Sequence, residues 1–324
     1  MTQAAAAVPL RLDWTLPLAR TLASRRPVVL MYHGVPPDGS DQVTARTFER
    51  HVQCLKNRFD LVAARESDRK RIRGGRIQVV LTFDDGFRNN AEVVAPILRR
   101  HRIPAEFFVS SRHSTPGRYL WFAYLRALER WFPWRLFSFR GETFSMAAGE
   151  RQQSIQRLRD LLLGLRPHPG AMYDAIDNEL PRLEDFVGEP ALAGHYAGMT
   201  AEQVGDLAAE PLFSVGVHTV DHPLLTRCEP DEARRQIDAN RTWLESVCGR
   251  RCEAVAYPGG DYSADLIQIC QTRGFSRGYV VARQLRTRSP LERERIGIYS
   301  RSLDVLQLKV QWGTFLRFLG LSIG

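Results

Sequence analysis

The chain has 324 residues, of which 44% are hydrophobic and 25% charged, a balance typical of a folded globular protein and unlike that of a disordered one. Its net charge of +9 favours anionic partners, and charge alone leaves open nucleic acid, phosphorylated carriers, an acidic membrane face or a solvated basic surface. Five scattered cysteines argue against a disulfide framework and agree with a reducing compartment.

The first 27 residues do not have the pattern of a signal peptide. No lysine or arginine precedes the alanines, and the apolar stretch is broken by Pro9, Arg11 and Asp13. No run in the sequence approaches the roughly 18 uncharged apolar residues that a membrane span needs. We therefore expect a cytoplasmic protein that contacts the inner membrane at most peripherally.

Short apolar runs alternate with amphipathic helical patterns along the chain, which predicts a mainly parallel sheet with helical crossovers. In residues 44–59, Phe48, Val52, Leu55 and Phe59 fall on one helical face. A second helical pattern ends at Gly249. The seven apolar runs are residues 27–32, 77–83, 105–109, 212–217, 253–257, 277–281 and 295–299.

Residues at about 112–199 interrupt this alternation with long helical patterns, so we expect a helical insertion within a single domain spanning 1–324. The insertion contains an apolar stripe, which we interpret as core packing rather than as a platform for a glycan. The stripe comprises Leu120, Trp121, Tyr124, Leu128 and Trp131. The alternation resumes where Thr200 and Gln203 predict a capping box.

Polar residues follow four of the predicted strands. His33 follows the first run, Asp84 and Asp85 the second, His218 the fourth, and Gly259 stands in a turn after the fifth. The carboxyl ends of parallel strands are where such folds build their sites. Two adjacent carboxylates repel each other and are costly to desolvate, so we expect them to hold a cation or a proton.

The segment "HTVDH" places His218 and His222 four residues apart, a spacing that lets two imidazoles share one divalent metal. Two histidines and one carboxylate from another strand leave open positions for water, as a catalytic metal site requires. The second carboxylate is then free to take a proton. The sequence therefore predicts that one aspartate holds a cation and its neighbour handles a proton.

The motifs "TFDDG", "HTVDH" and "YPGG" resemble the first three motifs of the polysaccharide deacetylases, carbohydrate esterase family 4. The resemblance implies a distorted (β/α) barrel with one divalent metal, zinc in the first place, with Co²⁺, Ni²⁺ or Fe²⁺ as alternatives. It implies that Asp84 is the general base, and that Asp85, His218 and His222 are the metal ligands. The backbone N–H of Gly259 would help to hold the oxyanion.

The sequence departs from that family pattern in two places. The third motif lacks the arginine that pairs with the base, and Arg295 is the candidate to replace it. No histidine follows His222 to act as the late general acid. The segment "VLMYHGV" resembles the first strand of circularly permuted and exopolysaccharide-associated deacetylases, which implies that His33 is the general acid. The other histidines are assigned to the metal, to helices or to the insertion, so elimination also leaves His33.

The resemblance implies removal of N-acetyl groups from an amino-sugar glycan or a lipid-linked sugar during polysaccharide biosynthesis or modification, with no nucleic-acid partner. An esterase or amidase acting on another acetylated substrate shares the same geometry of attack. A catalytically weak glycan- or membrane-binding component, using the last helix at 303–320, is the alternative from a different class. Such a relic would be expected to lose one of Asp84, Asp85, His218 or His222, and all four are present. The sequence leaves the oligomeric state open.

Overall fold

The computed structural model describes residues 27–39, 43–66, 76–165, 168–281 and 289–318. The N-terminal stretch that lacks a signal-peptide pattern lies outside these residues. Within the described segments, every helix is too short or too polar to cross a membrane.

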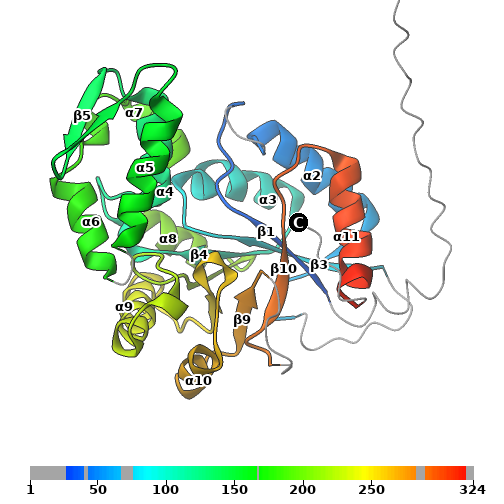
Figure 1. Cartoon of the computed structure of the whole chain (residues 1–324). Helices are drawn as coiled ribbons and strands as arrows, with labels where there is room; N and C mark the ends of the chain where they lie inside the picture. The colour runs from blue at the N-terminus through cyan, green and yellow to red at the C-terminus, as the bar shows by residue number, and fades with distance from the viewer. Residues whose placement is uncertain (1–26, 40–42, 67–75, 166–167, 282–288, 319–324) are drawn as a thin grey trace, which may run out of the picture.

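Seven parallel strands close into a barrel at the centre of the molecule (Figure 1). The ring closes because the first strand pairs with the third along its whole length, from Val28 opposite Val79 to Tyr32 opposite Phe83. A two-residue strand, β2 (Asp60–Leu61), extends β3 outside the ring. In spatial order the ring is β1 (Val28–Tyr32), β10 (Arg293–Gly297), β9 (Arg277–Val280), β8 (Ala254–Ala256), β7 (Phe213–Val217), β4 (Ala105–Val109) and β3 (Gln78–Phe83).

The predicted (β/α) barrel is thus confirmed, and its seven strands are the seven apolar runs of the sequence. The last strand, β10, begins and ends two residues earlier than its run at 295–299. Its first two residues pair with β9, and Arg295 to Gly297 pair with β1.

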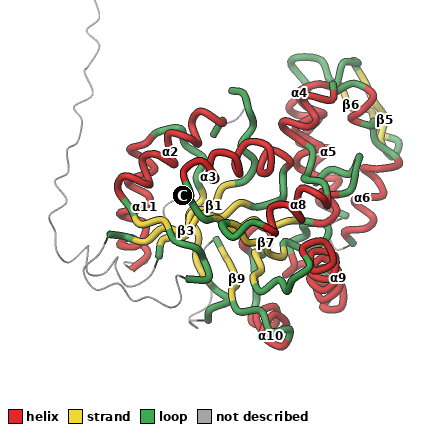
Figure 2. The backbone as a smooth tube through the Cα atoms, turned by 180° about the vertical axis from the view of Figure 1, so that it is seen from behind, coloured by secondary structure: helices red, strands yellow, loops and turns green. Residues whose placement is uncertain are grey.

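Helices surround the barrel on its outside, as the view from behind shows (Figure 2). Their apolar faces pack on the strands: in the first of them Phe48, Val52 and Leu55 are fully buried. The helix before β8 ends at Gly249, as predicted, because this residue takes the left-handed conformation at φ 63°. These outer helices are α2 (Ala45–Arg58), α3 (Ala95–His101), α8 (Ala201–Ala209), α9 (Pro230–Cys248), α10 (Ala264–Thr272) and α11 (Leu303–Phe318).

Side chains alternate between the outer helices and the interior of the barrel. The interior holds a small apolar cluster that includes Val29 and Phe108, and also a buried polar network. Glu106 accepts hydrogen bonds from Arg277 at 3.1 Å and from the Tyr279 hydroxyl at 2.8 Å. Burying an ion pair is costly, and here both oxygens of the carboxylate have partners that offset the cost.

The segment between β4 and β7 forms a separate hydrophobic cluster with its own secondary structure. The expected helices are present, but the segment also contains a β-hairpin that sequence analysis missed. The hairpin forms because Phe137, Phe139 and Phe144 alternate with polar residues and Arg140 and Gly141 turn the chain at positive φ. Its main elements are α4 (Trp121–Trp131), β5 (Leu136–Phe139), β6 (Glu142–Ser145), α5 (Arg151–Gly164) and α6 (Pro169–Asn178).

Of two further predictions for this part of the chain, one is confirmed in full and the other in part. Thr200 and Gln203 form a capping box, with hydrogen bonds of 3.0 and 3.1 Å between side chain and backbone in both directions. In the apolar stripe, Leu120, Tyr124 and Leu128 are buried in the core of the insertion. Core packing is wrong for Trp131, which is 38% exposed at the end of α4, and Trp121 is only partly buried.

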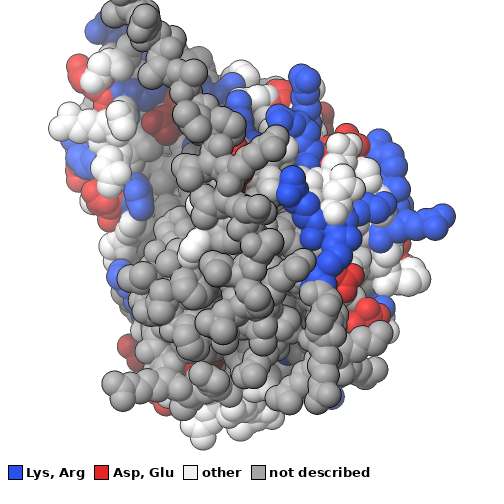
Figure 3. Space-filling view, turned by 90° about the vertical axis from the view of Figure 1, so that its right-hand side faces the viewer, with Lys and Arg blue, Asp and Glu red and all other residues white. Residues whose placement is uncertain are grey.

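Basic side chains lie close together on part of the described surface. Figure 3 shows lysines and arginines clustered at one edge of the described surface of that face.

The buried pair of Glu106 and Arg277 makes a stability prediction. Glu106→Ala leaves the Arg277 guanidinium buried without its main partner, and breaking such a pair costs about 3–5 kcal/mol. Urea unfolding followed by circular dichroism measures the loss. The control is Glu179→Ala, which removes the exposed partner of Arg140 and should shift the unfolding midpoint far less. Equal shifts for the two variants would contradict the prediction.

Candidate active site

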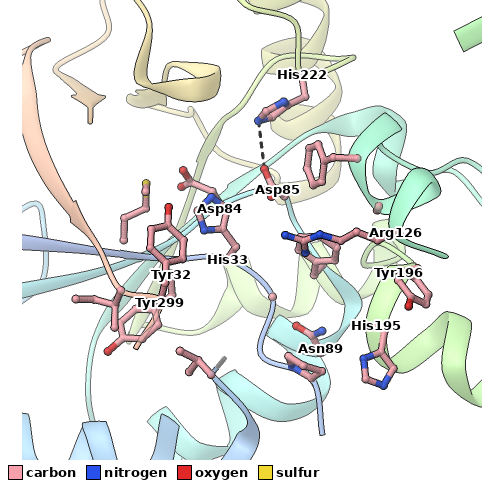
Figure 4. A pocket seen from close by; sticks show the side chains of 18 of the residues that line it. Tyr32, His33, Asp84, Asp85, Asn89, Arg126, His195, Tyr196, His222 and Tyr299 are labelled. Atoms are coloured by element: carbon pink, nitrogen blue, oxygen red, sulfur yellow. Dashed lines mark ion pairs between the residues drawn. The ribbon is translucent and has the colours of Figure 1, made fainter. Parts of the chain in front are cut away.

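Every residue predicted for the site lines one cleft at the carboxyl end of the barrel (Figure 4). The cleft has a volume of about 1040 Å³, at the upper end of the range for small-molecule sites. The predicted residues in its lining are His33, Asp84, Asp85, His218, His222, Gly259 and Arg295.

Asp85, His218 and His222 converge on one point. The Asp85 Oδ1 atom lies 3.3 Å from Nε2 of each histidine, and the three ligand atoms lie within 4.8 Å of one another. Asp85 is 1% exposed, and its Oδ1 has no hydrogen-bond partner among the described residues. A buried carboxylate oxygen without a donor, facing two imidazole nitrogens, fits a divalent cation.

The orientation of His218 is fixed from behind. Its Nδ1 lies 2.8 Å from the carbonyl oxygen of Ala256. Since a carbonyl only accepts, Nδ1 carries the proton and the Nε2 lone pair faces Asp85. The His218 backbone N–H is held by the Asn240 side chain at 3.0 Å, and its carbonyl accepts from Ser110 at 2.9 Å. A backbone carbonyl holding the second ring nitrogen is the arrangement that metal-binding histidines use.

The backbone around this triad is strained. Asp85, Thr219 and His222 have φ values of 73°, 66° and 53°, in the left-handed region that residues with a Cβ rarely adopt. Each such residue costs of the order of 1–3 kcal/mol, and such strain persists where it is part of a site. The Thr219 hydroxyl accepts from the His222 N–H at 3.1 Å and stabilises the turn between the two histidines.

The protonation states suit a cation site. Burial lowers the pKa of His222 to about 4, so its ring is neutral at pH 7 and able to donate a lone pair. Burial opposes ionisation of Asp85. The contact with His218 and the electrostatic effect of the neighbouring histidines outweigh burial and hold the pKa of the Asp85 carboxyl below the usual range. Burial also disfavours the charged form of His218, and here the Asp84 and Asp85 carboxylates outweigh it and raise the pKa. A bound cation would act against that rise, since a ligand histidine must be neutral.

Asp84 has a different environment from its neighbour. Its two oxygens accept from the two terminal nitrogens of Arg295 at 2.6 and 2.7 Å. Arg295 is 1% exposed, and its guanidinium packs on the rings of Phe108 and Tyr279, 5.6 and 5.7 Å from their centres. Burial raises the cost of ionising Asp84, but the Arg295 charge prevails and lowers the pKa of the carboxyl. The arginine that contacts this carboxylate thus comes from β10.

His33 lies beside Asp84 at the rim. The register pairs Tyr32 with Phe83, so the next residue of each strand, His33 and Asp84, are neighbours. The His33 ring stacks on Tyr299, with ring centres 5.8 Å apart and an interplanar angle of 25°.

Gly259 lies in the turn Pro258–Gly260 that follows β8. It adopts φ 65°, and a Cβ at this position would come within 2.7 Å of the Leu224 side chain. Both constraints favour glycine, and they bring the backbone of this turn to the cleft surface.

Several residues of the site were missed by sequence reasoning. His195 was set aside as part of the insertion, yet it lines the cleft, and elimination alone therefore does not single out His33. His113 contacts the carbonyl oxygens of Asp85 and Tyr196 at 3.0 and 2.8 Å and ties the strained Asp85 backbone to the insertion. The insertion also contributes Arg126. A sequence gives no signal for these residues, because their position depends on how the insertion packs.

Asn89 joins three loops around the cleft. Its side chain accepts from the Val35 N–H at 2.8 Å and donates to the Gly194 carbonyl at 2.9 Å. It stands next to the one-turn π-helix η1 (Asn90–Val94), a conformation that is frequent at functional sites.

The fold and the site together define a parallel barrel with an Asp–His–His cluster at its rim that could hold a cation. Residues 72–127 and 191–277 match the family model described as polysaccharide deacetylase. The chain therefore belongs to the polysaccharide deacetylases. The gap between the two matched ranges falls within the insertion.

Individual relatives are distant. YxkH of Bacillus subtilis (strain 168) is 17% identical over 254 residues, which cover 77% of this chain and 62% of that protein. This chain thus spans less than two thirds of the curated relative that it matches.

Two solved structures share the fold. IcaB from Ammonifex degensii is 19% identical, with a TM-score of 0.56 over 90% of this chain and 97% of that one. The Streptococcus pyogenes deacetylase PplD, solved with acetate, is 18% identical, with a TM-score of 0.52 over 87% and 97%.

The triad predicts metal binding that can be measured directly. The protein should bind about one divalent ion, and His218→Ala should release it, because a site with three protein ligands loses one of them. Elemental analysis after dialysis measures the ion content. His195→Ala, which alters the same cleft outside the triad, is the control and should keep the ion. Full metal content in the His218 variant would refute the ligand assignment.

Proposed function

We propose that this protein is a metal-dependent hydrolase that removes N-acetyl groups from an N-acetylated amino-sugar glycan during polysaccharide biosynthesis or modification. The observation that carries the proposal is the convergence of Asp85, His218 and His222 beside a second carboxylate, Asp84, whose partner is an arginine. The substrate is a glycan or a lipid-linked sugar, reached from the cytoplasm or at the inner membrane. Barrel and insertion act as one unit, with the insertion forming a wall of the site.

Asp85, His218 and His222 hold the ion. Two imidazoles and a carboxylate suit zinc, and Co²⁺, Ni²⁺ and Fe²⁺ accept the same donors. A divalent ion at this position would supply Lewis-acid polarisation of the acetyl carbonyl and would acidify the attacking water.

Asp84 takes the proton of the attacking water. Its lowered pKa keeps it ionised at neutral pH and ready to accept a proton, while Arg295 fixes both oxygens in direction. The same low pKa makes Asp84 a weak base, so it needs an acidified water as its proton donor. Arg295 is therefore a positioning residue whose charge also separates the role of Asp84 from that of Asp85.

His33 gives a proton to the leaving nitrogen. An amide anion is too basic to leave at neutral pH, so the nitrogen must be protonated as the C–N bond breaks. His33 neighbours Asp84 on the adjacent strand, and a proton on its ring would help to lower the pKa of both aspartates. His195 instead lies near Asp38, with 3.4 Å between Nε2 and Oδ1. The Gly259 backbone N–H completes the site as a donor to the oxyanion.

An esterase acting on O-acetyl groups is the second candidate within the same chemistry. An alkoxide or phenolate leaving group needs a proton far less than an amide nitrogen does. The presence of His33 beside the base favours the amide, because an ester would make little use of it. Acetate release from N-acetylglucosamine oligomers, lipid-linked N-acetyl sugars and O-acetylated glycans by the metal-loaded protein tests the proposal, and release from O-acetyl substrates alone would overturn it.

The role of Asp84 predicts a variant that binds the ion without turnover. Asp84→Asn keeps the shape of the side chain but cannot accept the proton, so acetate release should fall by about 10²- to 10⁴-fold. Metal content should stay at the wild-type level, since Asp84 is outside the triad. Near-normal turnover by this variant would remove Asp84 from the mechanism.

The role of His33 predicts a loss that depends on the leaving group. His33→Ala should bind the ion normally and lose acetate release from N-acetyl sugars, yet keep most of its hydrolysis of p-nitrophenyl acetate, whose leaving group needs no proton. His195→Ala serves as the matched control in the same cleft. The assignment fails if His33→Ala loses both activities equally, or if His195→Ala alone shows the selective loss.

A further inference from the structure

The charged side chains at the floor of the cleft are paired, whereas those on one wall form no ion pair with another described residue. Three acidic and three arginine side chains line the cleft. Asp84 pairs with Arg295, and Asp85 faces the two histidines. The remaining three charged residues, Arg126, Glu129 and Arg130, all come from α4 of the insertion.

Arg126 is the cation that faces the site. Its side chain extends from α4 into the cleft, towards the side where His33 and Asp85 lie (Figure 4). None of the acidic side chains in the described parts of the chain pairs with it. Arg130, one turn further on, instead places its guanidinium 5.5 Å from the ring centre of Trp131.

The charge of Arg126 acts across the cleft. Burial is the main cause of the raised pKa of Tyr299, and Arg126 opposes that rise from the opposite wall. Tyr299 is 49% exposed and stacks on His33. Arg126 and the proposed acid therefore border the same space.

With a divalent ion in the triad, the lining of the cleft becomes net positive, because its own acids and arginines balance. A positive, partly enclosed cleft attracts anions and strengthens their contacts inside it. The volume of about 1040 Å³ leaves room for groups next to the acetylated sugar.

We propose that Arg126 binds an oxyanion carried by the substrate, so that the preferred substrate is an acidic N-acetylated glycan. This inference rests on the proposed function. The shared chemistry is an anion with two oxygens in one plane, which the guanidinium fork binds through parallel hydrogen bonds. Its source is either the carboxylate of a uronic acid beside the N-acetyl sugar or the phosphate of a glycosyl phosphate.

The test compares three substrates with the metal-loaded protein: a neutral N-acetylglucosamine oligomer, an oligomer that alternates N-acetylglucosamine with glucuronic acid, and N-acetylglucosamine 1-phosphate. One of the two anionic substrates should have a higher kcat/KM than the neutral oligomer, and the faster one identifies the source of the anion. Arg126→Gln should lower kcat/KM for that substrate by about 10- to 100-fold, the scale of a charged hydrogen-bonded contact, and leave the neutral oligomer within about threefold.

Two variants separate a specific contact from a general effect of charge. Arg126→Lys keeps the charge but not the fork and should recover part of the preference. Arg159→Gln removes an exposed arginine on α5, outside the cleft lining, and should leave the preference intact. The preference for the anionic substrate should also shrink as NaCl rises from about 50 to about 500 mM. Salt screens the attraction between Arg126 and the anion, since the Debye length is about 10 Å at 0.1 M and shorter at higher concentration.

The inference is overturned if the wild-type protein has no preference for an anionic substrate. It is also overturned if Arg126→Gln lowers kcat/KM equally for all three substrates. Deacetylation of the neutral oligomer in that case leaves the proposed function standing. If no substrate releases acetate, calorimetric titration of the zinc-loaded Asp84→Asn protein with the same compounds decides. Equal affinity of this protein for anionic and neutral compounds then refutes the role of Arg126. The role is also refuted if Arg126→Gln, introduced into the Asp84→Asn protein, leaves the affinity for the anionic compounds unchanged.

Discussion

The buried pair of Asp84 and Arg295 is the interaction on which the rest of the site depends. Two adjacent carboxylates at the end of an apolar strand would repel each other, and removing both from water would be costly. Arg295 reaches Asp84 with two hydrogen bonds of 2.6 and 2.7 Å and cancels its charge. Asp85 is then the one remaining anion at this point, and it faces two histidines. Two identical side chains thereby acquire different surroundings, which suit them to the two roles proposed for them, one towards a proton and one towards a cation.

The closure of the barrel brings these partners together. β1 lies between β10 and β3, with Val29 opposite both Arg295 and Val80. Residues that are far apart in the sequence, His33, Asp84 and Arg295, therefore meet across adjacent strands at one rim. An open sheet would leave β10 and β3 at separate edges, and the arginine could not reach the aspartate. The function of the site is thus tied to the ring as a whole.

The sequence predicted what short-range rules determine. Apolar runs identify all seven barrel strands, since a strand buried on both faces has few polar residues, and the polar residues after the runs identify the rim. It missed the hairpin β5–β6, where alternation over four residues per strand is a weak signal, and it missed His113, Arg126 and His195. These side chains reach the cleft only because the insertion packs against the barrel, a long-range contact that no local pattern encodes. From the sequence, Arg295 was a candidate partner of Asp84, but the pairing itself could not be predicted, because it depends on barrel closure.

Arg295 and Arg126 differ in what their substitution would cost. Arg295 is fully buried, and removing it would leave a carboxylate in the barrel interior without a partner, so stability and function are coupled there. Arg126 is exposed on α4, outside the barrel, and has solvent as its alternative partner. A side chain of this kind can change with little effect on folding. The barrel therefore fixes the chemistry of the site, whereas the wall supplied by the insertion is free to change the choice of substrate.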